Sequence, residues 1–336
     1  MALNRRQKWR AEKIQSERIA RAKKASEKAE SEVSISGEEQ KGRVITRYGQ
    51  RQLVESNDGE LFQCTSRRNI DISVAGDEVI FQPTDNDNGI VTALLPRKNE
   101  LKRQEKLIAA NVDQLWLVVA AEPKYQFDLI DRYLVVAENA NLPIAIIINK
   151  IELVADLESL YEDFSIYKNL GYKLHFISVK KQLNLDDLKQ HLAEKTHIFL
   201  GQSGVGKSSL INELIPDLNI RVNEISQKSK LGKHTTTNTC IYKIASGGDL
   251  IDSPGIREFQ LDNLDTKDIL NGFREFTPLL GHCRFRNCQH INEPNCAIKE
   301  ALESGGIHPY RYNSYLRLIE SQIATPVRNC SNITQL

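Results

Sequence analysis

The sequence predicts a multidomain α/β protein in which a small β-barrel precedes a parallel sheet with helices on both faces, and a helical metal-binding segment follows. Five short β-rich runs separated by turn signals lie within residues 42–97. Apolar strands alternate with amphipathic helices in residues 98–258. Three cysteines and one histidine then gather within residues 283–296. We therefore expect domains at 42–97, 98–258 and 259–336, preceded by a basic arm and linker at 1–41.

The composition is that of an ordinary globular protein. The chain has 336 residues, of which 26% are charged, and its net charge of +1 indicates no partner. Its longest apolar run, at residues 142–148, is too short to span a bilayer, and the N-terminus lacks the apolar segment of a signal peptide. The clustered cysteines favour a metal site in a reducing compartment over a disulfide framework. We expect a cytoplasmic monomer with no membrane partner.

The N-terminal arm is rich in Ala, Lys and Glu and has almost no apolar stripe that could dock on a core. Such a segment either orders on a nucleic-acid backbone by displacing counterions or remains a solvated tail, and the sequence leaves both open. Residues 31–41, rich in Ser, Glu and Gly, are typical of a linker.

The first predicted domain is a five-stranded barrel, most simply an OB-fold. Its expected strands are residues 42–48, 51–56, 60–65, 78–82 and 89–95. Basic side chains lie between and along these runs, and we expect them to be exposed: Arg43, Arg47, Arg51, Arg67 and Arg68. A basic barrel face favours binding to single-stranded or looped RNA, although scattered arginines also serve only for solubility.

The second predicted domain is a parallel sheet. Strands are expected at residues 113–121, 143–149, 172–177 and 197–200, with helices at 127–140 and 185–195. Ligands of such sheets bind at the carboxyl ends of the strands, and each motif described below follows a predicted strand.

Residues 201–209 fit GxxxxGK[ST], the phosphate-binding P-loop, between a predicted strand and a predicted helix. The glycines let backbone N–H groups turn toward phosphate oxygens. Lys207 is expected to reach the β- and γ-phosphates, and the Ser208 hydroxyl is expected to ligate Mg²⁺. The predicted nucleotide contacts in this loop are Gly201, Gln202, Ser203, Gly204, Val205, Gly206, Lys207, Ser208 and Ser209.

A second motif predicts that the base is guanine. Asn149, Lys150, Ile151 and Glu152 are close to the NKxD signature, in which the acidic side chain accepts from guanine N1–H and the exocyclic amine. Here the fourth residue is Glu152, whose carboxylate is one methylene longer than that of Asp. Ser178, after the next strand, is expected to back the base.

Two further segments resemble nucleotide switches. One of the threonines at 235–237, for which Thr236 is our candidate, is expected to reach Mg²⁺ and the γ-phosphate. Asp252 and Gly255 fit DxxG and are expected to hold the Mg²⁺ shell and sense the γ-phosphate. Isoleucine follows Gly255, so no glutamine orients the attacking water there. His234 is the best internal substitute, with a structural histidine as the alternative.

The cysteine-rich segment predicts a structural zinc site. Cys283, Cys288, His290 and Cys296 supply three thiolates and one imidazole, and four protein ligands leave no open position. Arg284 and Arg286 between them suit contact with RNA or a protein.

Compared with the order in Ras-like proteins, these motifs are permuted: the guanine-recognition motif precedes the P-loop, and DxxG comes last. Together, NKIE, SVK, GQSGVGKSS, GKHTTT, DSPGIREF and the Cys/Cys/His/Cys segment make residues 42–323 similar to the small ribosomal subunit biogenesis GTPases of the RsgA (YjeQ) family. The resemblance implies an OB-fold, a circularly permuted P-loop GTPase domain and a zinc domain. Glu152 departs from the Asp that is usual in the family.

The resemblance also implies an activity and partners. It implies slow GTP hydrolysis to GDP that the small (30S) ribosomal subunit stimulates, a role in late maturation of that subunit, and contact with 16S rRNA. In this resemblance residues 149–152 and 201–209 bind GTP with Mg²⁺, the four Cys/His residues bind Zn²⁺, and His234 takes part in hydrolysis. The alternatives are a P-loop kinase or ATPase, and a binding module whose nucleotide is a structural plug.

Overall fold

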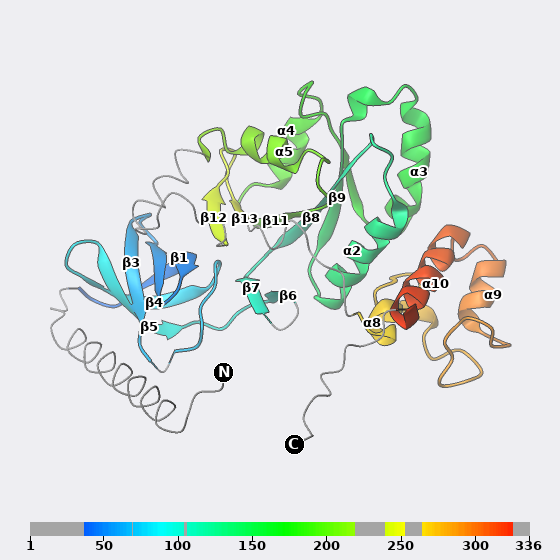
Figure 1. The fold of residues 1–336 in the computed structure, drawn as a ribbon, viewed down its shortest axis with the longest axis horizontal. Helices are drawn as coiled ribbons and strands as arrows, with labels where there is room; N and C mark the ends of the chain where they lie inside the picture. The colour runs from blue at the N-terminus through cyan, green and yellow to red at the C-terminus, as the bar shows by residue number, and fades with distance from the viewer. Residues whose placement is uncertain (1–36, 69, 104–105, 219–238, 253–263, 325–336) are drawn as a thin grey trace, which may run out of the picture.

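The computed structural model describes residues 37–68, 70–103, 106–218, 239–252 and 264–324 (Figure 1). A barrel, a helix-covered sheet and a helical C-terminal region follow one another along the chain. Three predicted site residues, His234, Thr236 and Gly255, lie outside the described residues, as does the arm at 1–36. The exact domain boundaries proposed above stay a prediction.

The barrel is closed, as an OB-fold requires. Its strands are β1 (Gln40–Tyr48), β2 (Arg51–Ser56), β3 (Leu61–Ser66), β4 (Glu78–Thr84) and β5 (Asn88–Leu94). They are hydrogen-bonded in the order β1-β2-β3-β5-β4, and β1 also pairs with β4, which closes the ring. Apolar side chains that alternate along the strands fill its interior: Val44, Val54, Phe62, Val79, Phe81 and Val91.

The expectation that all five barrel arginines are exposed is wrong for two of them. The Arg43 guanidinium is half-buried, pairs with Asp249 and donates to Thr196 Oγ1 at 2.7 Å. Arg47 is half-buried and donates to the carbonyl oxygen of Ser73 at 3.2 Å. Long-range carboxylates and carbonyls satisfy these two cations, and no local pattern reveals such partners. The other three arginines, Arg51, Arg67 and Arg68, are exposed as predicted.

The second domain is built on five parallel strands: β8 (Gln114–Ala120), β9 (Ile144–Asn149), β10 (Lys173–Phe176), β11 (Thr196–Leu200) and β13 (Asp249–Asp252). Their order is β10-β9-β8-β11-β13, and β12 (Cys240–Lys243) pairs antiparallel with β13. Because the five strands run in one direction, the segments after β9, β10, β11 and β13 leave the same edge of the sheet.

Helices cover both faces of this sheet (Figure 1). Helices α2 (Phe127–Asn139) and α3 (Leu157–Asn169) pack on one face, and α4 (Leu185–His191) and α5 (Lys207–Leu214) pack on the other. Side chains alternate along β8, so that Leu115 and Leu117 meet the first pair of helices and Trp116 and Val118 the second. Helix α3 was not among the helices predicted from the sequence.

The barrel and the sheet are joined by backbone pairing. Thr46 of β1 lies opposite Cys240 of β12, which makes one continuous sheet of 11 strands. Thr46 Oγ1 donates to the carbonyl oxygen of Thr239 at 2.9 Å. On the same seam Lys243 lies 2.9 Å from a carboxylate oxygen of Glu55.

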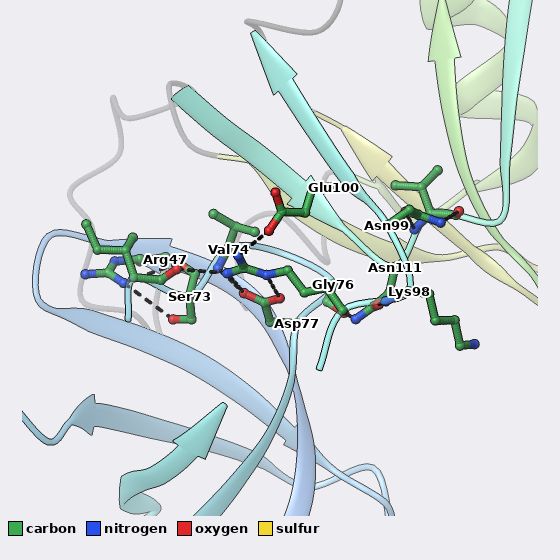
Figure 2. A network of polar contacts seen from close by, with 12 residues as sticks. Arg47, Ser73, Val74, Gly76, Asp77, Lys98, Asn99, Glu100 and Asn111 are labelled. Carbon is green, nitrogen blue, oxygen red and sulfur yellow. Dashed lines mark hydrogen bonds and ion pairs between the residues drawn. The ribbon is translucent and has the colours of Figure 1, made fainter. Parts of the chain in front are cut away.

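A hairpin of β6 (Glu100–Arg103) and β7 (Lys106–Ala110) makes a second junction between barrel and sheet (Figure 2). Arg97 donates to both carboxylate oxygens of the fully buried Asp77, at 2.7 and 2.9 Å. Asn111 accepts from the Lys98 backbone at 2.8 Å and donates to the Gly76 carbonyl at 2.9 Å. These bonds fix the connecting segment against the barrel.

The C-terminal region contains α8 (Thr266–Asn271), a 3₁₀ turn η2 (Thr277–Leu279), α9 (Ala297–Glu303) and α10 (Pro309–Ala324). Helices α8 and α10 pack against α2. At their contact, Arg311 pairs with Asp131 and with Glu275, and all three side chains are buried. Among the described residues, no helix has the length and apolarity needed to cross a membrane.

Candidate functional site

The P-loop follows β11 and has a conformation that requires glycine at two positions. Gly201 has a φ of 134°, and a Cβ there would lie 2.1 Å from the carbonyl oxygen of Val118. Gly206 has a φ of 97°, and a Cβ there would lie 2.3 Å from Nδ2 of Asn149. The loop is thus held against β8 and the last residue of β9 without room for a side chain.

Lys207 begins α5 directly after this loop. The residue is 8% exposed, and its Nζ donates to the carbonyl oxygen of Gly201 at 2.6 Å and also to that of Gln202. The ammonium group is therefore held over the loop, where a bound phosphate would compete with the carbonyls. Ser208 and Ser209 are exposed in the first turn of α5, so their hydroxyls are accessible to a ligand or its metal ion.

Asn149, the last residue of β9, joins two loops. Its Nδ2 donates to the Val205 carbonyl at 3.0 Å, and its Oδ1 accepts from the Val179 backbone at 3.3 Å. Lys150 has a left-handed φ of 65° and donates from Nζ to the Gly204 carbonyl at 2.7 Å. The first two residues of NKIE therefore hold the phosphate loop beside the loop that carries Ser178.

The acidic residue of the motif has an unused acceptor. Glu152 lies in the 3₁₀ turn Ile151–Leu153, and its buried Oε2 has no hydrogen-bond partner among the described residues. Buried carboxylate oxygens normally have donors, so this atom fits a ligand that brings N–H groups, as guanine does. Ser178 is fully buried, and its Oγ accepts from the Lys181 backbone at 3.0 Å. Its hydroxyl thus shapes the loop beside this position.

Asp252 ends β13, which is the neighbour of β11 in the sheet. The fold therefore brings Asp252 to the same sheet edge as the P-loop, although Asp252 lies 45 positions after Lys207 in the sequence. The NKIE segment, the P-loop and Asp252 therefore lie at one edge of the sheet in spite of their permuted order.

The four predicted zinc ligands also lie together. Their ligand atoms are all within 4.8 Å of one another. Cys283 Sγ is 3.8 Å from Cys296 Sγ, and His290 Nδ1 is 3.5 Å and 3.3 Å from these two sulfur atoms. Tetrahedral zinc with Zn–S bonds of about 2.3 Å and a Zn–N bond of about 2.0 Å separates sulfurs by about 3.8 Å and S–N pairs by about 3.5 Å. The donor set and its spacing fit a zinc ion.

The loop that carries His290 is braced by hydrogen bonds to its backbone. The hydroxyls of Tyr312 and Tyr315 donate to the carbonyl oxygens of His290 and Gln289 at 2.7 and 2.8 Å. The Glu293 carboxylate accepts from the Gln289 N–H at 2.8 Å, and the backbone N–H groups of this loop lower the pKa of Glu293 to about 2. Helix α10 thus orients the cysteine-rich segment.

Comparison with known proteins identifies the family. Residues 94–262 match the family model described as RsgA GTPase. A protein of Hahella chejuensis named small ribosomal subunit biogenesis GTPase RsgA is 47% identical over 95% of each chain. The chain belongs to the RsgA GTPase family. A Pseudomonas aeruginosa protein of the same name is 43% identical, covering 96% of this chain and 98% of its own.

Solved structures of RsgA-like proteins have the same fold. YjeQ from Thermotoga maritima is 31% identical with a TM-score of 0.73, covering 86% of this chain and 100% of its own. YloQ, described as a circularly permuted GTPase, is 28% identical with a TM-score of 0.70, covering 85% and 96%. The circular permutation predicted from motif order is confirmed, and this RsgA family member is a GTPase.

Two supporting residues of this RsgA GTPase were not predicted from the sequence. The carbonyl of Glu122, in the loop after β8, accepts from Lys150 Nζ at 3.2 Å. Asp131, which pairs with Arg311, supports the C-terminal region on α2. A sequence signal for Asp131 existed, because it lies beside core-facing residues of a helix, where a carboxylate needs a partner. A backbone carbonyl such as that of Glu122 has no such signal.

Proposed function

We propose that this RsgA GTPase binds GTP and GDP at the carboxyl edge of the sheet and hydrolyses GTP during maturation of the small ribosomal subunit. The observation that carries the nucleotide assignment is the contact of Asn149 with Val205 and Val179, which joins phosphate and base loops. The proposed contacts are Asn149, Lys150, Ile151, Glu152, Ser178, Gly201, Gln202, Ser203, Gly204, Val205, Gly206, Lys207, Ser208, Ser209, Thr236, Asp252 and Gly255.

The reaction is phosphoryl transfer to water, for which the protein positions groups and stabilises charge. Lys207 binds the β- and γ-phosphates and stabilises the negative charge that shifts to the leaving group. Ser208 and Asp252 would hold Mg²⁺, which neutralises phosphate charge when bound with GTP. From its sequence position, His234 is proposed to orient the attacking water, and Thr236 and Gly255 to contact the γ-phosphate side.

The C-terminal cluster is proposed to bind one structural zinc ion. Cys283, Cys288, His290 and Cys296 supply four ligands, so the ion has no open position for catalysis. Its proposed role is to hold the cysteine-rich loop together. The other contacts that hold this loop are the hydrogen bonds of Glu293 and of the two tyrosines of α10.

The ribosomal partner is proposed from the names of the relatives, which specify biogenesis of the small ribosomal subunit. Exposed Arg51, Arg67 and Arg68 on the barrel, and exposed Arg284 and Arg286 on the cysteine-rich loop, are available for phosphates of 16S rRNA. We propose that the protein acts as a cytoplasmic monomer that meets the subunit through both regions.

The test measures phosphate release from GTP and from ATP, each with and without purified small ribosomal subunits. We expect GTP-selective turnover that rises when subunits are added. Flat turnover on both nucleotides would refute the assignment of base and activator.

In parallel, Glu152→Gln should weaken GTP binding by about 10- to 100-fold, because the amide removes an ionised acceptor. Glu158→Gln, at an exposed position of α3, is the matched control.

A further inference from the structure

Two histidines and an aspartate form a second cluster of potential metal ligands, far in sequence from the cysteines. His175 lies on the edge strand β10, and Asp187 and His191 lie on α4. One ligand atom of each residue lies within 4.8 Å of the other two. We call these three residues the β10–α4 cluster. No motif of the GTPase includes them.

The two oxygens of Asp187 face one histidine each. His175 Nδ1 is 3.2 Å from Asp187 Oδ2, and His191 Nδ1 is 3.7 Å from Asp187 Oδ1. The two imidazole rings are edge to face, with centroids 4.9 Å apart. Ligands around a tetrahedral zinc ion, with bonds of about 2.0–2.2 Å to N and O, are separated by about 3.3–3.6 Å. Small side-chain rotations would therefore bring all three donors to one ion.

We propose that the β10–α4 cluster binds a divalent zinc ion through His175, Asp187 and His191, with water in the fourth position. The donor set favours this ion class, because imidazole nitrogen suits Zn²⁺ whereas Mg²⁺ and Ca²⁺ prefer oxygen ligands throughout. The single carboxylate leaves the occupied site with a net charge of only about +1.

The surroundings combine one fixed ligand with two accessible ones. The His175 side chain is 7% exposed and packs against Trp116, with ring centroids 5.3 Å apart. The side chains of Asp187 and His191 are 64% and 39% exposed, so an ion can enter from solvent. His191 Nδ1 is also 2.9 Å from the Asp187 carbonyl oxygen, a contact that the ion would replace when Nδ1 serves as its ligand.

The ion would connect the two ends of a functional loop. Residues 177–184 run from β10 to α4 and carry Ser178, whose neighbour Val179 bonds to Asn149. An ion held by both elements would brace this loop beside the nucleotide site. Zinc should therefore raise the thermal stability of the chain through this cluster, independently of the cysteine site.

The test counts zinc ions on the full-length chain by equilibrium dialysis and elemental analysis. We expect wild type to bind one more equivalent than His191→Ala at micromolar free zinc. Asp187→Asn should weaken the additional site by at least about 10-fold, since even outer partners of a metal site contribute that much. Asp186→Asn, the same charge change at the adjacent exposed position of α4, should retain it. Equal zinc content in wild type and His191→Ala would overturn the proposal.

A second readout uses Trp116, which lies against His175. In a Trp9→Phe background Trp116 is the remaining tryptophan, because the chain has two. Ni²⁺ bound to the cluster should quench its fluorescence saturably, and His191→Ala should abolish this saturable quenching. Quenching that is identical in the variant would contradict the site. Unchanged circular dichroism of the variants without added metal verifies that each remains folded.

Discussion

The side-chain amide of Asn149 donates a 3.0 Å hydrogen bond to the backbone oxygen of Val205, inside the phosphate loop. The NKIE segment, which we propose to recognise the base, therefore shapes the P-loop directly. Because the same amide accepts from Val179, one buried side chain holds two loops of the site.

Asn149→Asp tests this relationship. The carboxylate keeps an acceptor for the Val179 N–H but replaces the donor to Val205 by an oxygen that repels the carbonyl. We expect GDP affinity, measured with a fluorescent guanine nucleotide, to fall by about 10- to 100-fold. Asn141→Asp, which substitutes an exposed residue, is the control. Unchanged affinity in Asn149→Asp would show that the bond is dispensable.

Gly206→Ala should disrupt the same contact from the opposite side. The new Cβ would lie 2.3 Å from Asn149 Nδ2, so the loop or the Asn149 amide must shift and the bond to Val205 is disturbed. Nucleotide binding should be lost. Gly204→Ala separates this clash from backbone strain, because Gly204 also has a positive φ, 83°, but its Cβ would meet nothing within 4 Å. That variant should lose only about 1–2 kcal/mol of stability. Equal effects of the two variants would argue against the clash.

The buried contact between α10 and α2 should be sensitive to charge. Arg311→Met leaves Asp131 and Glu275 buried without their cation, which should cost about 3–5 kcal/mol. Hydrogen exchange in α2 and α10 would measure the loss of protection. Arg317→Ala is the comparison, because its pair with Asp128 on the same helices is about half exposed and should contribute under about 1 kcal/mol. Similar protection in both variants would contradict the assigned role of Arg311.

His197 should make the sheet sensitive to acid. It is fully buried, its Nδ1 accepts from Trp116 Nε1 at 2.9 Å, and its Nε2 is 3.0 Å from the Leu192 carbonyl oxygen. Burial lowers the pKa of His197 below 6.5. The unfolded chain therefore binds the proton first, and stability falls as pH decreases below about 6.5.

The measurement is the urea midpoint at several pH values from 7.5 to about 5. Wild type should lose stability toward acid, and His197→Gln should show a shallower pH dependence together with a lower midpoint at pH 7.5. His175 and His290 also have pKa values lowered by burial, so the slope should decrease without vanishing. A parallel pH profile in the variant would refute the role of His197.

Cys288→Ser tests the structural zinc site. The variant removes one of four ligands, and we expect the purified protein, after dialysis against a weak chelator, to lose about one equivalent of zinc relative to wild type. The C-terminal region should then melt at lower temperature. Cys64→Ser lies in the barrel interior and should retain the zinc even if it lowers barrel stability. Zinc content unchanged by Cys288→Ser would contradict the ligand assignment.

Much of the fold could be predicted because its determinants are local. The alternation in the barrel strands and the apolar runs of β8 and β9 agree with the structure to within a few residues. The P-loop and NKIE could be recognised because backbone geometry and chemistry demand particular residues at fixed spacing. Helix α3 was missed, although Asp156 accepts from the backbone of Glu158 and Ser159 as an N-cap.

What could not be predicted depends on partners distant in sequence. The exposure of Arg43 depends on Asp249, more than 200 residues away, and the charge of Asp131 is balanced by Arg311 from another region. Likewise, the β10–α4 cluster requires knowing which side chains of a strand and a helix share a face. Single-sequence periodicity identifies faces but not the residues opposite them.

The pairing of β1 with β12 has a consequence for synthesis of the chain. Strand β1 emerges from the ribosome almost 200 residues before β12, whose Cys240 lies opposite Thr46. The barrel can close through β1–β4 pairing as soon as its own strands are available, whereas the junction with the sheet must await the last third of translation. The domains thus fold as a vectorial series: this junction closes a long loop at a high entropic cost after the barrel has formed, and the docking of α8 and α10 on α2 comes later still.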